Sequence, residues 1–197
     1  MIKFVTLKKL KIFDLYYQLK IFKFLKKKNL DKFEFFFDVG AHRGESINLF
    51  TKNFNISNVY SFEASPINFK ILQKNFLNKF INVEIYNYGL GGSISDSYIN
   101  QNLESSSSTI NPINDNSRYL NRKLKILKIK NKNLFIKKIP IKIITLDKFI
   151  DEKNINNIDI LKIDTEGFEF NVLRGLKINH AKIKIIYFEH HYDDMIV

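Results

Sequence analysis

Short apolar runs alternate with segments of helical periodicity along most of this chain, and that alternation restricts the fold more than any other feature. Between the runs, residues 45–54 place apolar side chains on one helical face, and Ser65 followed by Pro66 is a typical helix start. Strands that alternate with helices form parallel sheets through right-handed crossovers. We therefore predict an α/β fold with helices on both faces of a parallel sheet. The predicted strands cover residues 33–39, 58–62, 82–87, 159–164 and 182–188.

The regular alternation is interrupted between residues 88 and 136. Residues 93–100 and 137–144 alternate in the manner of antiparallel strands, and Pro140 favours a position at a sheet edge. Residues 111–122 are polar and are predicted to form a loop. We interpret this region as an inserted hairpin that covers one end of the sheet. Short helices are predicted over 146–152 and 169–174.

The N-terminal segment, residues 5–28, has the periodicity of an amphipathic helix rich in lysine. Its predicted apolar face contains Leu10, Phe13, Tyr17, Ile21 and Phe24. We favour a helix that packs on the edge of the core, because an aromatic face this wide calls for a protein partner. The alternative is a peripheral membrane contact through residues 5–28. The chain is accordingly divided into a helical segment, 1–30, and a main domain, 31–197.

The composition of the 197 residues narrows the classes of function. The net charge is +12, but arginine occurs only at Arg43, Arg118, Arg122 and Arg174, so we expect no nucleic-acid partner. The absence of cysteine excludes disulfides, thiolate metal sites and cysteine nucleophiles. No apolar run approaches the roughly 20 residues that span a bilayer, and no signal-peptide cleavage site is evident. We expect a cytoplasmic protein, with membrane contact limited to its surface.

The first candidate site is the turn that follows the first predicted strand. Asp38 lies near the end of this strand and Gly40, Ala41 and Gly44 follow in the turn, and such a turn lets a ligand approach the backbone closely. The glycine spacing differs from the dinucleotide fingerprint Gly-x-Gly-x-x-Gly. The carboxylate of Asp38 suits a cationic ligand better than a phosphate.

Acidic residues also follow the next strands. Glu63 comes directly after the second strand, where a carboxylate accepts the hydroxyls of a ribose; the alternative is a surface acid. Asp164 and Glu166 come at the carboxyl end of the strand at 159–164. The alternative is helix capping, with Asp164 or Thr165 as the N-cap of the next helix and the acids favouring its dipole. His191 follows the last strand and is a candidate general base. No complete set of metal ligands appears, so no metal is expected.

Four segments in order resemble the FkbM-type methyltransferases that use S-adenosylmethionine. They are FDVGAHRGE at 37–45, YSFEASP at 60–66, TLD at 145–147 and LKIDTEGFE at 161–169, and the resemblance covers about residues 35–194. The serine run at 105–108 is similar too. The resemblance implies a Rossmann-like class I methyltransferase sheet and methylation of a hydroxyl on a sugar, glycan or secondary metabolite.

The resemblance also implies roles for the candidate residues. The amino-acid end of S-adenosylmethionine would lie against Asp38, Gly40, Ala41 and Gly44. Its ribose would lie against Glu63 and Ala64, and its adenine against Gly89 and Leu90. Asp164, Glu166 and His191 are the candidate bases that take the proton of the acceptor hydroxyl.

A full class I sheet has seven strands, and this sequence is expected to lack the C-terminal hairpin of the last two. The strand at 182–188 would then be an apolar edge, covered by a second chain or by the N-terminal helix. This expectation leaves a rival interpretation open, an inactive or partner-dependent S-adenosylmethionine-binding remnant. A basic protein that binds nucleic acid or a membrane surface is the third.

Overall fold

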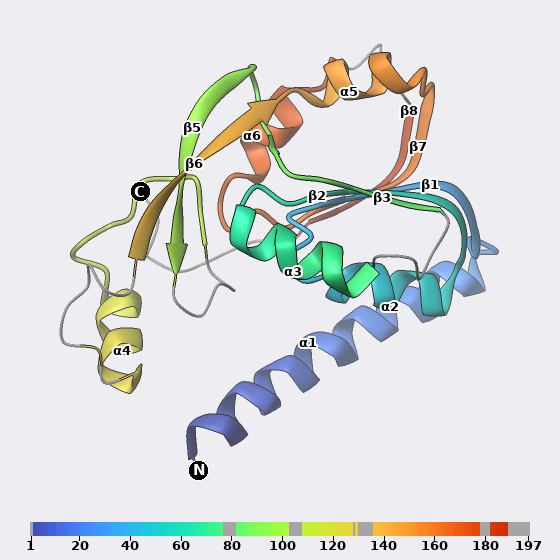
Figure 1. The fold of residues 1–197 in the computed structure, drawn as a ribbon. Helices are drawn as coiled ribbons and strands as arrows, with labels where there is room; N and C mark the ends of the chain where they lie inside the picture. Colours follow the sequence, from blue (N-terminus) through green and yellow to red (C-terminus); the bar gives the residue numbers. More distant parts are fainter. Residues whose placement is uncertain are drawn as a thin grey trace.

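The computed structural model contains a parallel α/β body, a small inserted sheet and a long N-terminal helix (Figure 1). The structure describes residues 2–76, 82–102, 108–127, 129, 136–177 and 182–188, and the side chains among them except those of 2–14, 123 and 127. The helices are α1 (Ile2–Lys27), α2 (Glu45–Asn53), α3 (Pro66–Phe76), α4 (Arg118–Leu127), α5 (Leu146–Lys153) and α6 (Glu169–Arg174). The strands are β1 (Lys32–Val39), β2 (Asn55–Phe62), β3 (Val83–Tyr86), β4 (Gly89–Leu90), β5 (Ser95–Asn102), β6 (Ile136–Ile144), β7 (Asn157–Ile163) and β8 (Lys182–Phe188).

The main sheet has five parallel strands in the order β3-β2-β1-β7-β8, which confirms the five predicted strands and the α/β fold. Val39, the last residue of β1, lies beside Phe62 of β2 and Ile163 of β7. The carboxyl ends of these strands therefore meet at one edge. The chain turns to opposite sides of the sheet at β1 and β7, and ligands of open α/β sheets bind at such a point.

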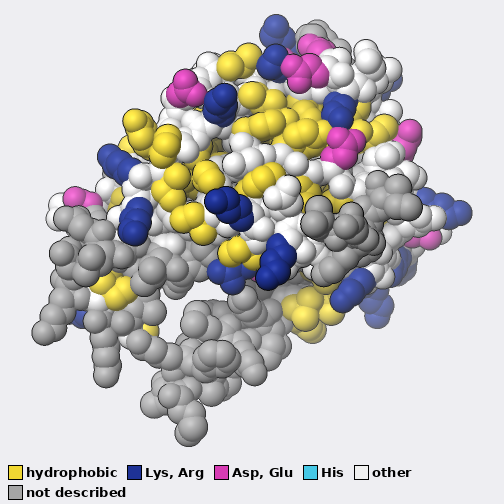
Figure 2. Space-filling model, viewed as in Figure 1, with side chains coloured by type: hydrophobic (Ala, Val, Ile, Leu, Met, Phe, Trp, Pro, Cys, Tyr) yellow, Lys and Arg dark blue, Asp and Glu magenta, His cyan; other side chains and the backbone are white. Residues whose placement is uncertain are grey.

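Two apolar clusters cover the two faces of the sheet. One joins Phe36 and Val59 of the sheet to α1, α2 and α3. The other joins Phe37 and Phe62 to α5 and α6, and Phe149 of α5 lies edge-on to both rings. Figure 2 shows hydrophobic side chains at the surface between α5 and the sheet, where Figure 1 places β3. Each strand face is thus apolar, as expected of a sheet buried on both sides.

The insertion forms a second sheet with the strand order β4-β6-β5. β5 and β6 pair antiparallel as predicted, but the predicted loop at 111–122 is wrong in part because α4 begins at Arg118. The Ser117 hydroxyl accepts a hydrogen bond from the Leu120 amide, and Leu120 is fully buried. Pro140 pairs only with β5, since β4 pairs with Ile143 and Ile144 alone. Although β6 is the middle strand of this sheet, Pro140 therefore has a neighbouring strand on one side only in the described part of the chain, and this is the setting in which a proline is tolerated.

The helix α1 is present as predicted, but its packed face is not the predicted one. Phe22 and Leu25 are buried against α2, and the Phe22 ring lies 4.7 Å from Phe50 and 4.9 Å from Phe54. Tyr17, Ile21 and Phe24, which were expected to face the core, are exposed. Apolar residues occur on more than one side of α1, so periodicity alone could not select the buried face. Leu10 and Phe13 lie among side chains that the structure does not describe.

The strand β8 is the edge of the sheet within the described part of the chain, and its residues alternate between exposed and half-buried. The absence of two further strands stays a prediction, because residues 189–197 lie outside the described residues. No helix among the described residues is long and apolar enough to cross a bilayer.

The packing of α1 leads to a paired mutational prediction. Phe22→Ala should lower the free energy of unfolding by about 3–5 kcal/mol, because it leaves a cavity beside Phe50 and Phe54. Phe24→Ala, which alters an exposed ring two residues away, should change it by less than about 0.5 kcal/mol. Urea unfolding followed by circular dichroism measures both values. Equal losses would show that the buried face of α1 is assigned incorrectly.

Candidate functional site

A cavity of about 490 Å³ lies at the carboxyl ends of β1, β2 and β7, which is within the usual range for small-molecule sites. Its wall includes eight residues that the sequence singled out: Gly40, Ala41, Glu63, Ala64, Gly89, Leu90, Asp164 and Glu166. Asp38 and Gly44 are not on the wall. The insertion contributes Ile99, Ser108 and Ile110, and α1 contributes Leu15 and Gln18. The cavity is thus enclosed by segments far apart in the sequence.

The turn after β1 depends on two glycines. The space that they leave is filled by other parts of the protein and is not available to a ligand. Gly40 and Gly44 have φ angles of 81° and 90°. A Cβ atom on Gly40 would lie 1.8 Å from the carbonyl oxygen of Asp164, and one on Gly44 would lie 2.1 Å from the ring of Phe76. Gly40 therefore lets the turns after β1 and β7 touch, and Gly44 lets α2 begin against α3.

Glu63 is held rigidly on the cavity wall at the end of β2. Its Oε2 accepts a hydrogen bond from the His42 amide at 2.7 Å, and its Oε1 accepts one from the Ser65 amide at 2.8 Å. The side chain is almost fully buried. Burial raises the pKa of Glu63 to about 7, although hydrogen bonds from Ser65 and His42 oppose the shift. The carboxylate thus keeps a fixed orientation and retains lone pairs for a ligand.

Asn68, which the sequence analysis did not single out, lies on the same part of the wall. It is buried in the first turn of α3, and its backbone amide donates to the Ser65 hydroxyl, which caps the helix as predicted. Its side-chain Oδ1 has no hydrogen-bond partner among the described residues. A buried polar atom without a partner is costly, so this oxygen suits a donor on a bound ligand.

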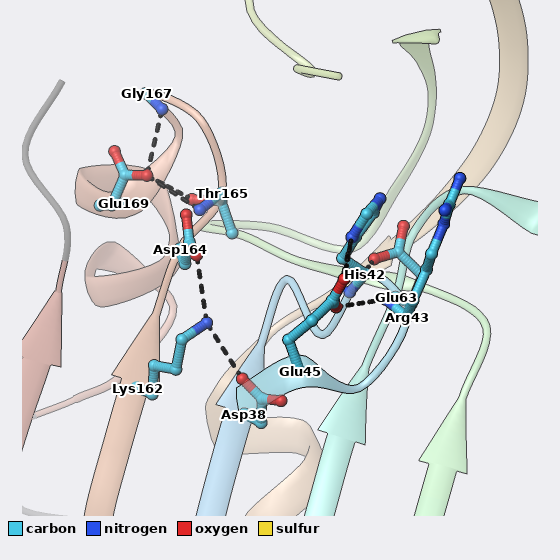
Figure 3. A network of polar contacts seen from close by, with 10 residues as sticks. All are labelled: Asp38, His42, Arg43, Glu45, Glu63, Lys162, Asp164, Thr165, Gly167 and Glu169. Atoms are coloured by element: carbon cyan, nitrogen blue, oxygen red, sulfur yellow. Dashed lines mark hydrogen bonds and ion pairs between the residues drawn. The ribbon is translucent and has the colours of Figure 1, made fainter. Parts of the chain in front are cut away.

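His42, Arg43 and Glu45 form a small polar group on the turn between β1 and α2 (Figure 3). The Glu45 carboxylate lies 3.3 Å from His42 Nδ1 and accepts from the Arg43 amide at 3.2 Å. Burial acts against this ionised acid, but these hydrogen bonds outweigh burial and lower the pKa of Glu45 to about 2. Glu45 and His42 both line the cavity, so this turn adds a fixed negative charge to the wall.

A buried ion network joins the two central strands below the cavity. The Lys162 Nζ atom lies 3.2 Å from Asp38 Oδ1 and 3.3 Å from Asp164 Oδ2 (Figure 3). Burial alone would lower the pKa of Lys162, but the two carboxylates outweigh it and raise that pKa. Burial raises the pKa of Asp38, against the effect of Lys162. Asp38 was expected to face a cationic ligand directly; it instead lies behind the wall, and its contact with a ligand stays a prediction.

The turn after β7 is fixed by an acid that the sequence analysis did not single out. Glu169 Oε1 accepts hydrogen bonds from the Thr165 amide, the Thr165 hydroxyl and the Gly167 amide. The alternative that Asp164 or Thr165 caps α6 is wrong, because Phe168 precedes this helix and Glu169 binds the turn. Among the described residues, no side chain caps the N-terminus of α6.

The insertion is fastened to the same turn. The Thr109 hydroxyl donates to the Glu166 carbonyl at 2.7 Å, and the Asn111 side-chain amide donates to the Gly167 carbonyl at 2.7 Å. Glu166 has a φ of 53°, as does His42 at 50° on the facing turn. Non-glycine residues in this conformation are uncommon and concentrate at functional sites. Here both lie on the cavity wall.

Lys162 had a recognisable signal in the sequence. A lysine inside an apolar strand needs partners, and two-residue periodicity places Lys162 on the same side of β7 as Asp164. The cavity residues that α1 and the insertion contribute are placed by tertiary packing, and no pattern in the sequence indicates them. His191 and Ser105 to Ser107 lie outside the described residues. No group of three His, Asp or Glu side chains suited to a metal occurs in the part of the chain that the structure describes.

The strand order, with a crevice at the carboxyl ends of the central strands and a carboxylate after β2, defines a Rossmann-like fold. The family model for the methyltransferase FkbM domain matches residues 38–195, and the chain therefore belongs to the FkbM methyltransferase family. A crystal structure of methyltransferase FkbM from Methylobacillus flagellatus KT is similar, with 18% sequence identity and a TM-score of 0.42. That match covers 74% of this chain and 29% of the other chain. No curated protein matches.

We predict that the ion network is required for stability. Lys162→Met should lower the free energy of unfolding by about 3–5 kcal/mol, because two acids remain without their buried cation. Adding Asp38→Asn should recover part of this loss, since it removes one of the uncompensated charges. Lys142→Met, an exposed strand lysine, is the matched control and should cost less than about 0.5 kcal/mol. Urea unfolding of the four proteins tests the network, and a loss equal to that of the control would refute it.

Proposed function

We propose that this protein transfers a methyl group from S-adenosylmethionine to a hydroxyl of a sugar, glycan or secondary metabolite. The observation that carries the proposal is Glu63, an acid held by two backbone amides at the end of β2 and directed to a cavity at the switch point of the sheet. A carboxylate in this position accepts hydrogen bonds from two adjacent ribose hydroxyls. Membership of the FkbM methyltransferase family supports the same ligand.

The polar groups on the cavity wall are mainly hydrogen-bond acceptors, and they fit a nucleoside that carries a positive charge. Four carboxylates, those of Glu45, Glu63, Asp164 and Glu166, line the cavity together with one lysine. Such a wall favours a cation and disfavours a phosphate. The buried Asn68 oxygen adds a second acceptor beside Glu63. Gly89 and Leu90 supply an apolar stretch for the adenine ring. The backbone of Gly40 and Ala41 leaves space for the amino-acid end of S-adenosylmethionine.

When bound, S-adenosylmethionine supplies an activated methyl group on a positively charged sulfur. The protein contributes mainly position, because an in-line displacement requires the acceptor oxygen to be aligned. It must also accept the proton that leaves the acceptor hydroxyl. We assign this role to Asp164, which lies on the wall and is oriented by Lys162, and we place Glu166 as the alternative base.

The cofactor site is tested by Glu63→Gln. The variant keeps the shape of the side chain but loses the charge, and affinity for S-adenosylhomocysteine should fall about ten- to a hundredfold, the effect of a hydrogen bond to a charged group. Glu84→Gln is the matched control, because Glu84 is an exposed acid on the neighbouring strand β3 and its partner is Lys153. Titration calorimetry measures both. Unchanged affinity in Glu63→Gln would refute the ribose assignment.

The same interaction has a pH dependence. Only ionised Glu63 accepts both hydroxyls, and with a pKa of about 7 its ionised fraction rises about tenfold between pH 6 and 8. Affinity should rise by about that factor in the wild type and not in Glu63→Gln. The contribution of Glu63 to the stability of the fold changes with pH in the opposite direction. The raised pKa makes the contribution of Glu63 to stability fullest below its ordinary value of 4.5, and that contribution is lost as pH rises through about 7.

The base is tested by Asp164→Asn. Methyl transfer from labelled S-adenosylmethionine to a panel of mono- and oligosaccharides should slow by about 10²–10⁴-fold, while affinity for S-adenosylhomocysteine changes little. Glu166→Gln is the comparison on the same turn and should keep most of the activity. The reverse ranking would make Glu166 the base. Tight binding with no transfer to any acceptor would favour the inactive remnant.

A further inference from the structure

The outer face of α1 presents aromatic and aliphatic side chains to solvent. Phe22 and Leu25 hold the helix on the core, whereas Tyr16, Tyr17 and Phe24 on the other sides have 53%, 61% and 57% of their surfaces exposed. The aliphatic side chains of Leu19 and Ile21 are exposed as well. Single exposed apolar residues are common on proteins, but Tyr17, Ile21 and Phe24 follow one another at spacings of four and three residues and form a row along one side of the helix, which indicates a binding surface.

Lysines are interleaved with these apolar residues. Residues 2–28 contain nine lysines and one acid, Asp14. Lys20 lies over the ring of Tyr16 at 4.5 Å, and Lys28 lies over that of Phe24 at 5.9 Å. Among the described residues, no acidic side chain pairs with Lys20, Lys23 or Lys27. Figure 2 shows hydrophobic and basic side chains together at its lower right, where Figure 1 places the described half of α1.

We propose that α1 docks the protein on an anionic lipid surface. Aromatic rings of amphipathic helices insert at the boundary between headgroups and acyl chains, and lysines beside them bind anionic headgroups. The long lysine side chains can extend to the headgroups while their stems remain in apolar contact. The buried pair Phe22 and Leu25 leaves the aromatic side of the helix available for this contact.

Two other occupants fit this surface less well. A second copy of the chain would bring two lysine-rich helices together, and like charges at an interface oppose association. A nucleic acid would satisfy the lysines but offers no apolar phase for Leu19 and Ile21, and the helix contains no arginine to read bases. An anionic bilayer meets both requirements, charge and apolar contact.

The position of α1 connects this docking surface with the cavity. Leu15 and Gln18 of α1 form part of the cavity wall, next to Ser46 and Leu49 of α2. A protein held on lipid through α1 therefore has this side of its cavity close to the headgroups. If the proposed methyl transfer is correct, on which this step rests, the acceptor hydroxyl belongs to the headgroup of an amphiphile.

Vesicle co-sedimentation of the full chain tests the docking without any assay of methyl transfer. The probes are vesicles of phosphatidylcholine alone and of phosphatidylcholine with 30% phosphatidylglycerol, a composition chosen as about that of an anionic membrane. Binding should require the anionic lipid and should weaken as salt is added. Equal binding to both kinds of vesicle, or none, would overturn the proposal.

Two triple variants separate the contributions of charge and apolar contact. Lys20→Glu/Lys23→Glu/Lys27→Glu and Tyr16→Ser/Tyr17→Ser/Phe24→Ser should each lower the vesicle partition coefficient by about tenfold or more. Lys148→Glu/Lys177→Glu/Lys182→Glu carries the same change of charge on exposed lysines outside α1 and should retain binding. An equal loss in this control would show a non-specific effect of net charge and would overturn the proposal.

The pattern of losses among these variants and two further measurements complete the test. If the lysine variant loses vesicle binding and the aromatic variant does not, the binding depends on charge alone. That result would point to a nucleic acid or another polyanion as the natural partner and would overturn lipid docking. A concentration-dependent dimer that only the aromatic variant abolishes would assign the surface to a second copy. Affinity for S-adenosylhomocysteine should stay unchanged in all three variants, so failure of the docking and failure of the proposed function are distinguishable.

Discussion

The Lys162 ammonium between Asp38 and Asp164 is the interaction on which the rest of the structure depends. It joins β1 to β7 directly below the cavity. These are the two strands between which the order of the strands in the sheet reverses. A buried lysine without these acids would be very costly, and so would the acids without the lysine. The network therefore holds the floor of the site while leaving the Asp164 carboxylate on the wall. Stability and position are supplied by the same three side chains.

Much of the main sheet could be predicted because β1, β2 and β7 are short apolar runs that end in a glycine turn or an acid. These runs also placed Glu63 and Asp164 at one edge, since parallel strands align their carboxyl ends. The buried face of α1 could not be predicted, because both Phe22 and Phe24 are apolar and only tertiary contacts with α2 distinguish them. The helix α4 was missed because a polar composition concealed the apolar position Leu120.

The role of Asp38 shows a different limit of sequence reasoning. An acid near the end of β1 looks available to a cationic ligand, yet its partner is a lysine more than a hundred residues later in the chain. The register of β1 and β7 places Asp38 and Lys162 side by side, and no local pattern contains that register. Glu169 belongs to the same category, since its three hydrogen bonds to the turn of residues 165–167 become evident only from the path of the backbone.

The walls of the cavity differ in how they are attached. The insertion is bound to the turn after β7 by the directional hydrogen bonds of Thr109 and Asn111, whereas Phe22 and Leu25 attach α1 through apolar contact, which tolerates sliding. Leu15 and Gln18 are on that second side. A displacement of α1 would therefore change the lining of the cavity at these two residues while leaving the hydrogen bonds of the insertion intact.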